Sequence, residues 1–499
     1  MGPKGTGAVA QPPSRSTSQS PAQSPSQSWV AFFQRLLPGA AREWVLLFLI
    51  VQSAIDIDGF VNPNARWASL CAIVEDGTMR IDNYHQHTMD WARTPDGHTH
   101  SNKAPGPVMV ALPLFWAIDR AVVAGAADRA ERDARRIAAR VPVLHALSVV
   151  TQAIPWALLV AMVIGLLREL AVPRVAQHLA AVALLFGNTA SLLMNTFFGH
   201  GMAACFVLAA ALSLYRRWSF RLGLFFGLAV LSDYGVALLA LPLIVLLVRG
   251  RWTSMRDLRG VALGLAAPAV AFVAYHAYSF GGPLALPNKF QNPVFVDTTA
   301  QSPTLWGVLR WLPDPEVFLL LLFGSERGVA FTQGWVLLSI AALAISWRGN
   351  APTLTDPDQR AFVSQMGTLV VSGFALLLTM NACFLGWHGG EAPGPRYLSA
   401  VLPLFALPAA CLFSTLPPFA RHLFVAALGV SVALFVLVFG TANILPQGGP
   451  LFSYYLRVLR DDLTARAAPR TLVLSLGFAG ATFRAWKDCQ DCRPRPHQV

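Results

Sequence analysis

The sequence predicts an all-α, polytopic membrane protein with about eleven transmembrane helices and a large first outer loop that contains juxtamembrane helices. Of the 499 residues, 55% are hydrophobic and only 13% are charged, whereas soluble domains average roughly 25% charged residues. The net charge of +12 comes largely from arginines that stand in short clusters between apolar runs, as the positive-inside rule describes. A stripe that follows nucleic-acid phosphates would be arranged differently, so we expect a lipid bilayer and no nucleic acid as partners.

Composition divides the chain into three parts. Residues 1–28 are rich in Ser, Pro, Gln and Gly and lack the apolar region of a signal peptide, so we expect a disordered tail. Residues 29–441 are the expected transmembrane domain, with its first outer loop at 58–140, and residues 442–499 are the expected outer tail. In this tail, Thr471 to Phe483 is too short to span a bilayer. Cys489 and Cys492 form a close pair, for which an outer location favours a disulfide over a zinc site.

The first predicted span is Trp44 to Ile57, and Arg35 and Arg42 place its start in the cytoplasm. The next apolar run, Val108 to Val123, decides the orientation of everything that follows. If this run crosses the membrane, most later arginine clusters fall outside. If it lies along the outer face, those clusters fall in the cytoplasm, so we predict a juxtamembrane position.

The remaining predicted spans are apolar runs joined by brief basic links on the cytoplasmic side. They are Val141 to Leu167, Leu179 to Met194, Gly201 to Tyr215, Leu222 to Leu231, Gly235 to Val248, Val261 to Tyr278, Val329 to Trp347, Phe362 to Phe384, Leu398 to Leu412 and Leu423 to Thr441.

Polar residues gather in the first outer loop, where chemistry in a membrane protein is most expected. Asp56 and Asp58 stand at the outer end of the first span. A partly desolvated carboxylate there can have a raised pKa suited to accepting a proton, although an acidic helix end exposed to solvent would look the same.

A second polar group lies further along this loop. Asp90, His98, His100 and Lys103 precede the bend Ala104 to Pro107. A lysine beside histidines, held at a membrane surface, suits a phosphate or pyrophosphate group, although it can also extend to lipid phosphates. The histidine spacing matches no strong metal template, so we assign no metal site.

Two later segments complete the candidate site. Glu326 and Arg327 stand at a span entrance, where charge can also serve only as an anchor. The segment Trp387-His-Gly-Gly-Glu-Ala-Pro-Gly-Pro-Arg-Tyr397 combines a rigid turn with a forked phosphate donor, Arg396. The substrate-binding candidates are His98, His100, Lys103, Glu326, Arg327, His388, Arg396 and Tyr397. Asp233 and His200 carry weaker signals, each most simply explained as part of a turn.

These motifs, in this order, resemble a known family. The pattern is a first span ending in Asp, then Asp-x-Ala, Gly-His-x-x-Ser-x-Lys-Ala-Pro-Gly, a later Arg-Gly, and Trp-x-Gly-Gly-x-x-x-Gly-Pro-Arg-Tyr-Leu. Between about Trp44 and Thr441 the chain is similar to bacterial C-type integral-membrane glycosyltransferases, which are related to the protein mannosyltransferases and the lipid A aminoarabinose transferase.

The resemblance implies a function. Such an enzyme moves a sugar, with inversion, from a polyprenyl-phosphate donor to an acceptor hydroxyl of a lipid, glycan or protein at the periplasmic face of the bacterial inner membrane. The family's catalytic base corresponds to Asp56 or Asp58, its second loop acid to Asp90, and its phosphate-holding residue to Lys103. No cofactor is implied with certainty, and a divalent metal stays possible because some relatives use one.

Two other functions stay open from the sequence. A transporter or flippase for a lipid-linked sugar would need paired halves and charges at mid-membrane, and no internal repeat is visible. An acyl- or phosphotransferase would depend on a histidine such as His100 or His388.

Overall fold

Helices make up most of the chain in the computed structural model, which describes residues 2, 39–53, 61–250, 252, 254–296, 304–348, 357–390, 392–441, 449–461, 476–482, 484, 485 and 487. Four described helices are long and apolar enough to cross a membrane, by length and composition: Arg140–Glu169, Met255–Phe280, Gln359–Cys383 and Pro418–Phe439. Six further apolar helices are shorter. The architecture is therefore compatible with an all-α membrane protein.

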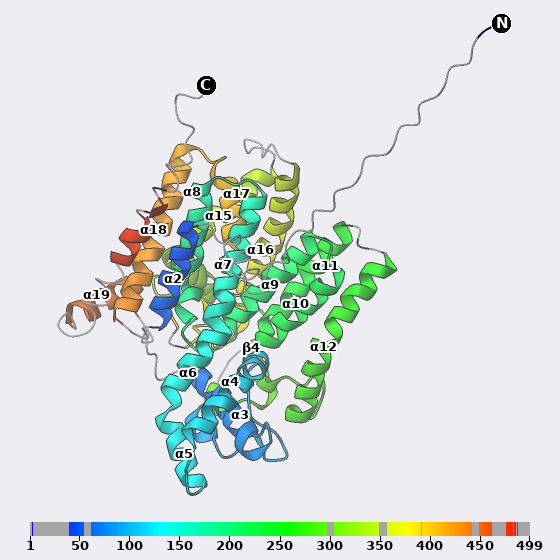
Figure 1. Cartoon of the computed structure of the whole chain (residues 1–499), viewed down its shortest axis with the longest axis vertical. Coiled ribbons are helices and arrows are strands. Elements are labelled where there is room, and N and C mark those ends of the chain that lie inside the picture. Colours follow the sequence, from blue (N-terminus) through cyan, green and yellow to red (C-terminus); the bar gives the residue numbers. More distant parts are fainter. Residues whose placement is uncertain are drawn as a thin grey trace.

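Figure 1 shows a bundle of helices with α3, α4 and α5 gathered beyond one of its ends. The helices are α2 (Gly39–Ser53), α3 (Val61–Asp76), α4 (Gly106–Val122), α5 (Arg129–Ala138), α6 (Arg140–Ser148), α7 (Ile154–Glu169), α8 (Arg174–Leu185), α9 (His200–Tyr215), α10 (Ser219–Ser232), α11 (Ala240–Arg249), α12 (Met255–Phe280), α13 (Pro315–Phe323), α14 (Val329–Gln333), α15 (Trp335–Trp347), α16 (Pro357–Cys383), α17 (Ala406–Phe413), α18 (Pro418–Thr441) and α19 (Leu451–Asp461). A π-helical turn, Val149–Ala153, joins α6 to α7 without a break.

Several predicted spans are not single α-helices. Gly235 to Val248 begins as a 3-10 segment, Tyr234–Leu239, and Leu398 to Leu412 contains another, Leu402–Phe405. Leu179 to Met194 is not one helix: α8 ends at Leu185, and the chain continues as a 3-10 turn, Thr189–Leu193. The Asn188 side chain caps that turn by accepting a hydrogen bond from the Ala190 N–H at 2.7 Å, which gives the backbone an alternative to the α-helix. The predicted span Val329 to Trp347 is divided at Gly334 into α14 and α15.

Helices α10 and α12 approach closely because glycines face backbone across their contact. A Cβ on Gly223 would lie 2.1 Å from the Val261 carbonyl oxygen, and a Cβ on Gly264 would lie 2.0 Å from the Phe220 carbonyl oxygen. Any larger residue would push the helices apart. This contact fixes α12, whose last turns carry Tyr275 toward the polar loop.

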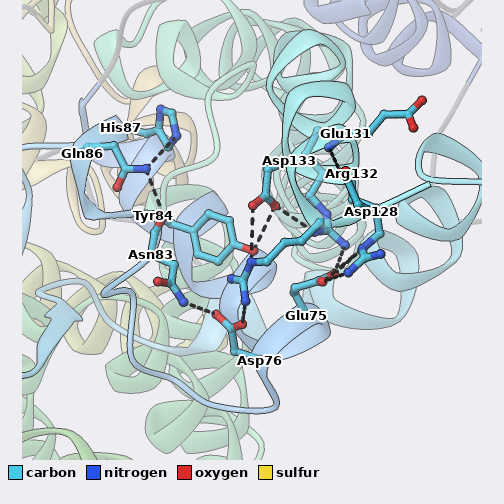
Figure 2. A network of polar contacts seen from close by, with 12 residues as sticks. Glu75, Asp76, Asn83, Tyr84, Gln86, His87, Asp128, Glu131, Arg132 and Asp133 are labelled. Carbon is cyan, nitrogen blue, oxygen red and sulfur yellow. Dashed lines mark hydrogen bonds and ion pairs between the residues drawn. The ribbon is translucent and has the colours of Figure 1, made fainter. Parts of the chain in front are cut away.

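The unit formed by α3, α4 and α5 has its own apolar core and a network of ion pairs. Its core contains Trp67, Leu70, Phe115 and other buried side chains. Glu75 of α3 pairs with Arg132 of α5 at 2.5 Å, as Figure 2 shows, and Asp76 pairs with Arg129 at 2.8 Å. The buried Arg136 donates to Asp119 of α4 at 2.7 Å and to Glu75 at 2.8 Å. The predicted first outer loop thus contains three helices that ion pairs join to one another.

Residues assigned by the sequence to the outer tail pack against the bundle where they are described. Leu451 and Tyr455 of α19 are fully buried in the main core, and α19 lies against α18. The Gly449 N–H donates to the Glu326 carboxylate at 2.7 Å.

Candidate active site

A short β hairpin brings Asp90 and Lys103 together. Strand β1 (Trp91–Arg93) pairs antiparallel with β2 (Thr99–Ser101), with Trp91 opposite Ser101. Asp90 and Lys103 flank the paired strands, and their side chains form an ion pair of 3.0 Å with exposed fractions of 14% and 18%. Burial lowers the pKa of Lys103, the charge of Asp90 opposes this effect, and Arg396 and Arg66 add to it.

The bend after Lys103 fits against two helix ends because glycines leave room for it. A Cβ on Gly106 would lie 2.6 Å from the Leu231 carbonyl oxygen. A Cβ on Gly199 would lie 1.9 Å from the Ser232 carbonyl oxygen and 3.4 Å from the Pro107 ring. The start of α4, the start of α9 and the end of α10 therefore meet beside Lys103.

Two tyrosines hold the backbone of this bend. The Tyr275 hydroxyl donates to the Ser101 carbonyl oxygen at 3.1 Å and lies 3.4 Å from that of Lys103. The Tyr234 hydroxyl approaches the Lys103 carbonyl oxygen at 3.5 Å. Both hydroxyls bond to backbone, which leaves the Lys103 ammonium group oriented by Asp90.

Arg66 of α3 is a buried cation of the same site. Its side chain donates to the Asn62 side chain and, at 3.4 Å, to the Phe197 carbonyl oxygen. Burial lowers the pKa of Arg66 to about 10, against the opposing charges of Asp233 and Asp90. Arg66 makes no ion pair with a described carboxylate, so its charge acts on the site through space.

Arg396 enters the site stacked on aromatic rings. Its guanidinium carbon lies 5.4 Å from the Phe198 ring centroid and 5.2 Å from that of Tyr397. Its Nε is buried without a hydrogen-bond partner, and no described carboxylate pairs with it. Gly389, with a φ of +68°, makes room for this side chain, since a Cβ there would lie 3.0 Å from the Arg396 Cγ. A planar, stacked guanidinium with a spare donor suits an oxyanion.

Arg327 and Glu326 shape the neighbouring turns. Arg327 donates to the carbonyl oxygens of His388 and Ala392 at 2.5 and 2.7 Å. The His388 Nδ1 accepts from the Gly390 N–H at 3.0 Å. Arg327 is therefore a positioning residue for the turn that presents Arg396. Glu326 links the segment before α14 to the segment before α19.

The other two predicted histidines turn away from Lys103. His98 pairs with Asp82 at 2.8 Å and is partly exposed. His100 is buried, with its ring against Tyr278 and Phe280. No group of three metal-binding side chains occurs among the described residues, and Asp56 and Asp58 lie outside them.

Of the predicted site residues, the described structure brings together Asp90, Lys103, Arg396 and Tyr397. Sequence reasoning missed Arg66 and Tyr275. The signal for Arg66 was a single arginine inside the segment Val61 to Ala72, most of which is apolar or small.

The described site carries more positive than negative charge. Arg66, Lys103 and Arg396 are three cations against the two carboxylates of Asp90 and Asp233, which leaves one positive charge in excess. Buried charge without a partner is costly, so this surplus favours binding of an anion.

Comparison with known protein families and with curated proteins finds no family model and no relative that matches this chain. The functional argument therefore depends on the site itself.

Proposed function

We propose that the chain is a membrane glycosyltransferase that moves a sugar from a polyprenyl-phosphate donor to an acceptor hydroxyl, with inversion, on the outer face of the bacterial inner membrane. In this proposal the bundle contains the eleven predicted spans, and the site faces the periplasm. The observation that supports it most is the Arg396 guanidinium, which packs on an aromatic ring and has no described carboxylate partner. The charges of Arg396 and Arg66 also help to lower the pKa of the Lys103 ammonium group. A phosphate group is the ligand that such a set of cations recognises.

The chemistry needs three events at this site. The acceptor oxygen forms a bond to C1 of the sugar while its proton passes to a base. The bond between C1 and the phosphate oxygen breaks, and the electron pair leaves with the phosphate. Lys103 and Arg396 stabilise the charge that grows on this phosphate, and the resemblance assigns the base to Asp56 or Asp58.

The placement of charges disfavours the transporter alternative. The Arg, Lys, Asp and Glu residues of the four described candidate spans lie at or near their ends, whereas transporters place charged residues at mid-membrane. The cations of the site lie instead in the predicted first outer loop and at helix ends.

The test uses the full chain in nanodiscs with a panel of radiolabelled polyprenyl-phosphate sugars and unlabelled acceptor extracts. We expect one donor to be consumed by the wild type, and Lys103→Ala to reduce turnover on the order of 100-fold. Lys289→Ala is the matched control, because Lys289 is exposed and the one described interaction of its ammonium group is with the Phe290 ring, at 5.4 Å from the ring centroid. Asp56→Asn and Asp58→Asn identify the base.

If the donors bind to the wild type and to all variants without turnover, and if both Asp variants behave like the wild type, the glycosyltransferase proposal is contradicted and transport is favoured.

A further inference from the structure

A histidine and a carboxylate form a pair beside the cations of the site. The Nδ1 of His200, the first residue of α9, lies 2.9 Å from the Asp233 carboxylate at the end of α10. The other Asp233 oxygen accepts from the Gly235 N–H at 3.1 Å. The carboxylate is thus fixed by backbone and in turn fixes the imidazole.

This arrangement leaves Nε2 as the reactive atom. With a proton on Nδ1 donated to Asp233, Nε2 carries the free lone pair of a neutral imidazole. No described residue forms a hydrogen bond with Nε2, which is not among the buried unpartnered atoms, and the side chain keeps 12% exposure. A base oriented by a third group, with an open lone pair, is the usual geometry for proton abstraction.

The pair lies inside the proposed site. The Phe198 ring centroid is 5.4 Å from that of His200 and 5.4 Å from the Arg396 guanidinium carbon, so one aromatic ring separates the imidazole from this cation. On the other side, Gly199 packs against Pro107 of the bend that follows Lys103. The imidazole therefore borders the region in which Lys103 and Arg396 would hold the donor phosphate.

We propose that His200, oriented by Asp233, is a catalytic base of the transfer and takes up the proton of the acceptor hydroxyl. This inference rests on the proposed transferase function and revises one part of it: the acceptor proton passes to His200 in place of Asp56 or Asp58, which the resemblance had assigned as the base. The acceptor O–H bond breaks, the proton joins Nε2, and the new C1–O bond forms as the sugar–phosphate bond breaks. The imidazolium is stabilised by Asp233 and returns its proton to water after the product leaves.

The proposed role as a base sets the direction of the pH dependence. The charged and titratable groups around His200 are Asp233, Tyr234, Arg66, Lys103 and Arg396. Because only neutral imidazole accepts a proton, turnover at saturating donor falls as pH decreases.

The experiment measures kcat and donor KM against pH for wild type, His200→Gln, Asp233→Asn and His85→Gln. The Gln amide can donate to Asp233 as the imidazole does but cannot accept a proton. We expect His200→Gln to lose about 100-fold or more in kcat, to keep its donor KM, and to lose the acid-side fall. Asp233→Asn should also lower kcat, because the imidazole loses the carboxylate that orients it. His85 is the control, because its Nδ1 contacts only the Asp82 backbone carbonyl.

A second measurement distinguishes a chemical role of His200 from misfolding of the variant. Added imidazole should restore turnover in His200→Ala, and restoration identifies a chemical role in place of a structural one. Two outcomes overturn the role of His200 but leave the transferase proposal intact. One is wild-type turnover in His200→Gln. The other is a reduced turnover with an unchanged pH profile, together with no rescue by imidazole. Absence of transfer by the wild type overturns both proposals.

Discussion

Replacement of Arg136 by alanine is expected to destabilise the unit formed by α3, α4 and α5. Arg136 is 3% exposed and pairs with Asp119, also 3% exposed, with Glu75 and with Asp133. Glu75 keeps Arg132 as a partner in the variant, whereas Asp119 loses the only cation with which it pairs among the described residues.

The expected magnitude follows from that burial. Removing one partner of a buried ion pair costs about 3–5 kcal/mol, because the remaining charge stays desolvated. Arg135→Ala is the control on the same helix: its pair with Glu131 has exposed fractions of 37% and 40%, and an ion pair this exposed to water contributes little to stability. The double replacement Arg136→Met with Asp119→Leu should recover much of the loss, because no charge is then left buried.

The assay is unfolding of the detergent-solubilised protein, followed by tryptophan fluorescence and by proteolysis within residues 61–140. Proteolysis within this range is the local readout, because the charged α5 helix belongs to this unit, whereas the fluorescence of the 14 tryptophans reports on the whole chain. Equal stability of Arg136→Ala and Arg135→Ala would refute the reasoning, because the buried pair would then contribute no more than the surface pair.

Three further predictions concern the site, the bundle and acid stability. Arg396→Lys should raise the donor KM about tenfold although charge is kept, because lysine cannot match the stacked, forked guanidinium; an unchanged KM in the transfer assay contradicts this. Gly264→Leu should lower thermal stability by about 1–3 kcal/mol, because its Cβ would lie 2.0 Å from the Phe220 carbonyl oxygen, and a wild-type melting curve would disprove it. The hydrogen bond from Arg132 lowers the pKa of Glu75, while burial opposes the shift. The stabilisation from Glu75 is therefore complete above the ordinary carboxyl pKa and is lost as pH falls through the lowered one; acid unfolding curves of wild type and Glu75→Gln that differ by a constant amount at every pH would exclude it.

The local sequence pattern pointed to several residues of the candidate site but did not predict which residues they contact. The sequence placed Asp90 and Lys103 in one polar loop, but the ion pair between them depends on the register of a three-residue hairpin. The helix break after Leu185 was missed because the run from Leu179 to Met194 is mostly apolar, and the cap by Asn188 prevailed over that apolarity.

The burial of Arg66 is a second feature that the sequence pattern did not predict. An arginine in a polar loop is normally exposed, and only the packing of α3 against α4 and the segment at Phe197 buries it. The pair of His200 and Asp233 likewise joins residues 33 positions apart, each of which is explained by a simple turn when considered alone.

The sequence by itself determined the helical class and the apolar character of the chain, because hydrophobic transfer free energy accumulates along each run and needs no knowledge of neighbours. Tertiary structure alone decided which charges meet. Arg66 and Lys103 come from the same loop, whereas Arg396 lies 293 residues beyond Lys103. Their approach depends on glycine contacts such as those of Gly106 and Gly199, where helix ends nearly touch backbone. Such contacts are properties of paired surfaces, so no local pattern encodes them.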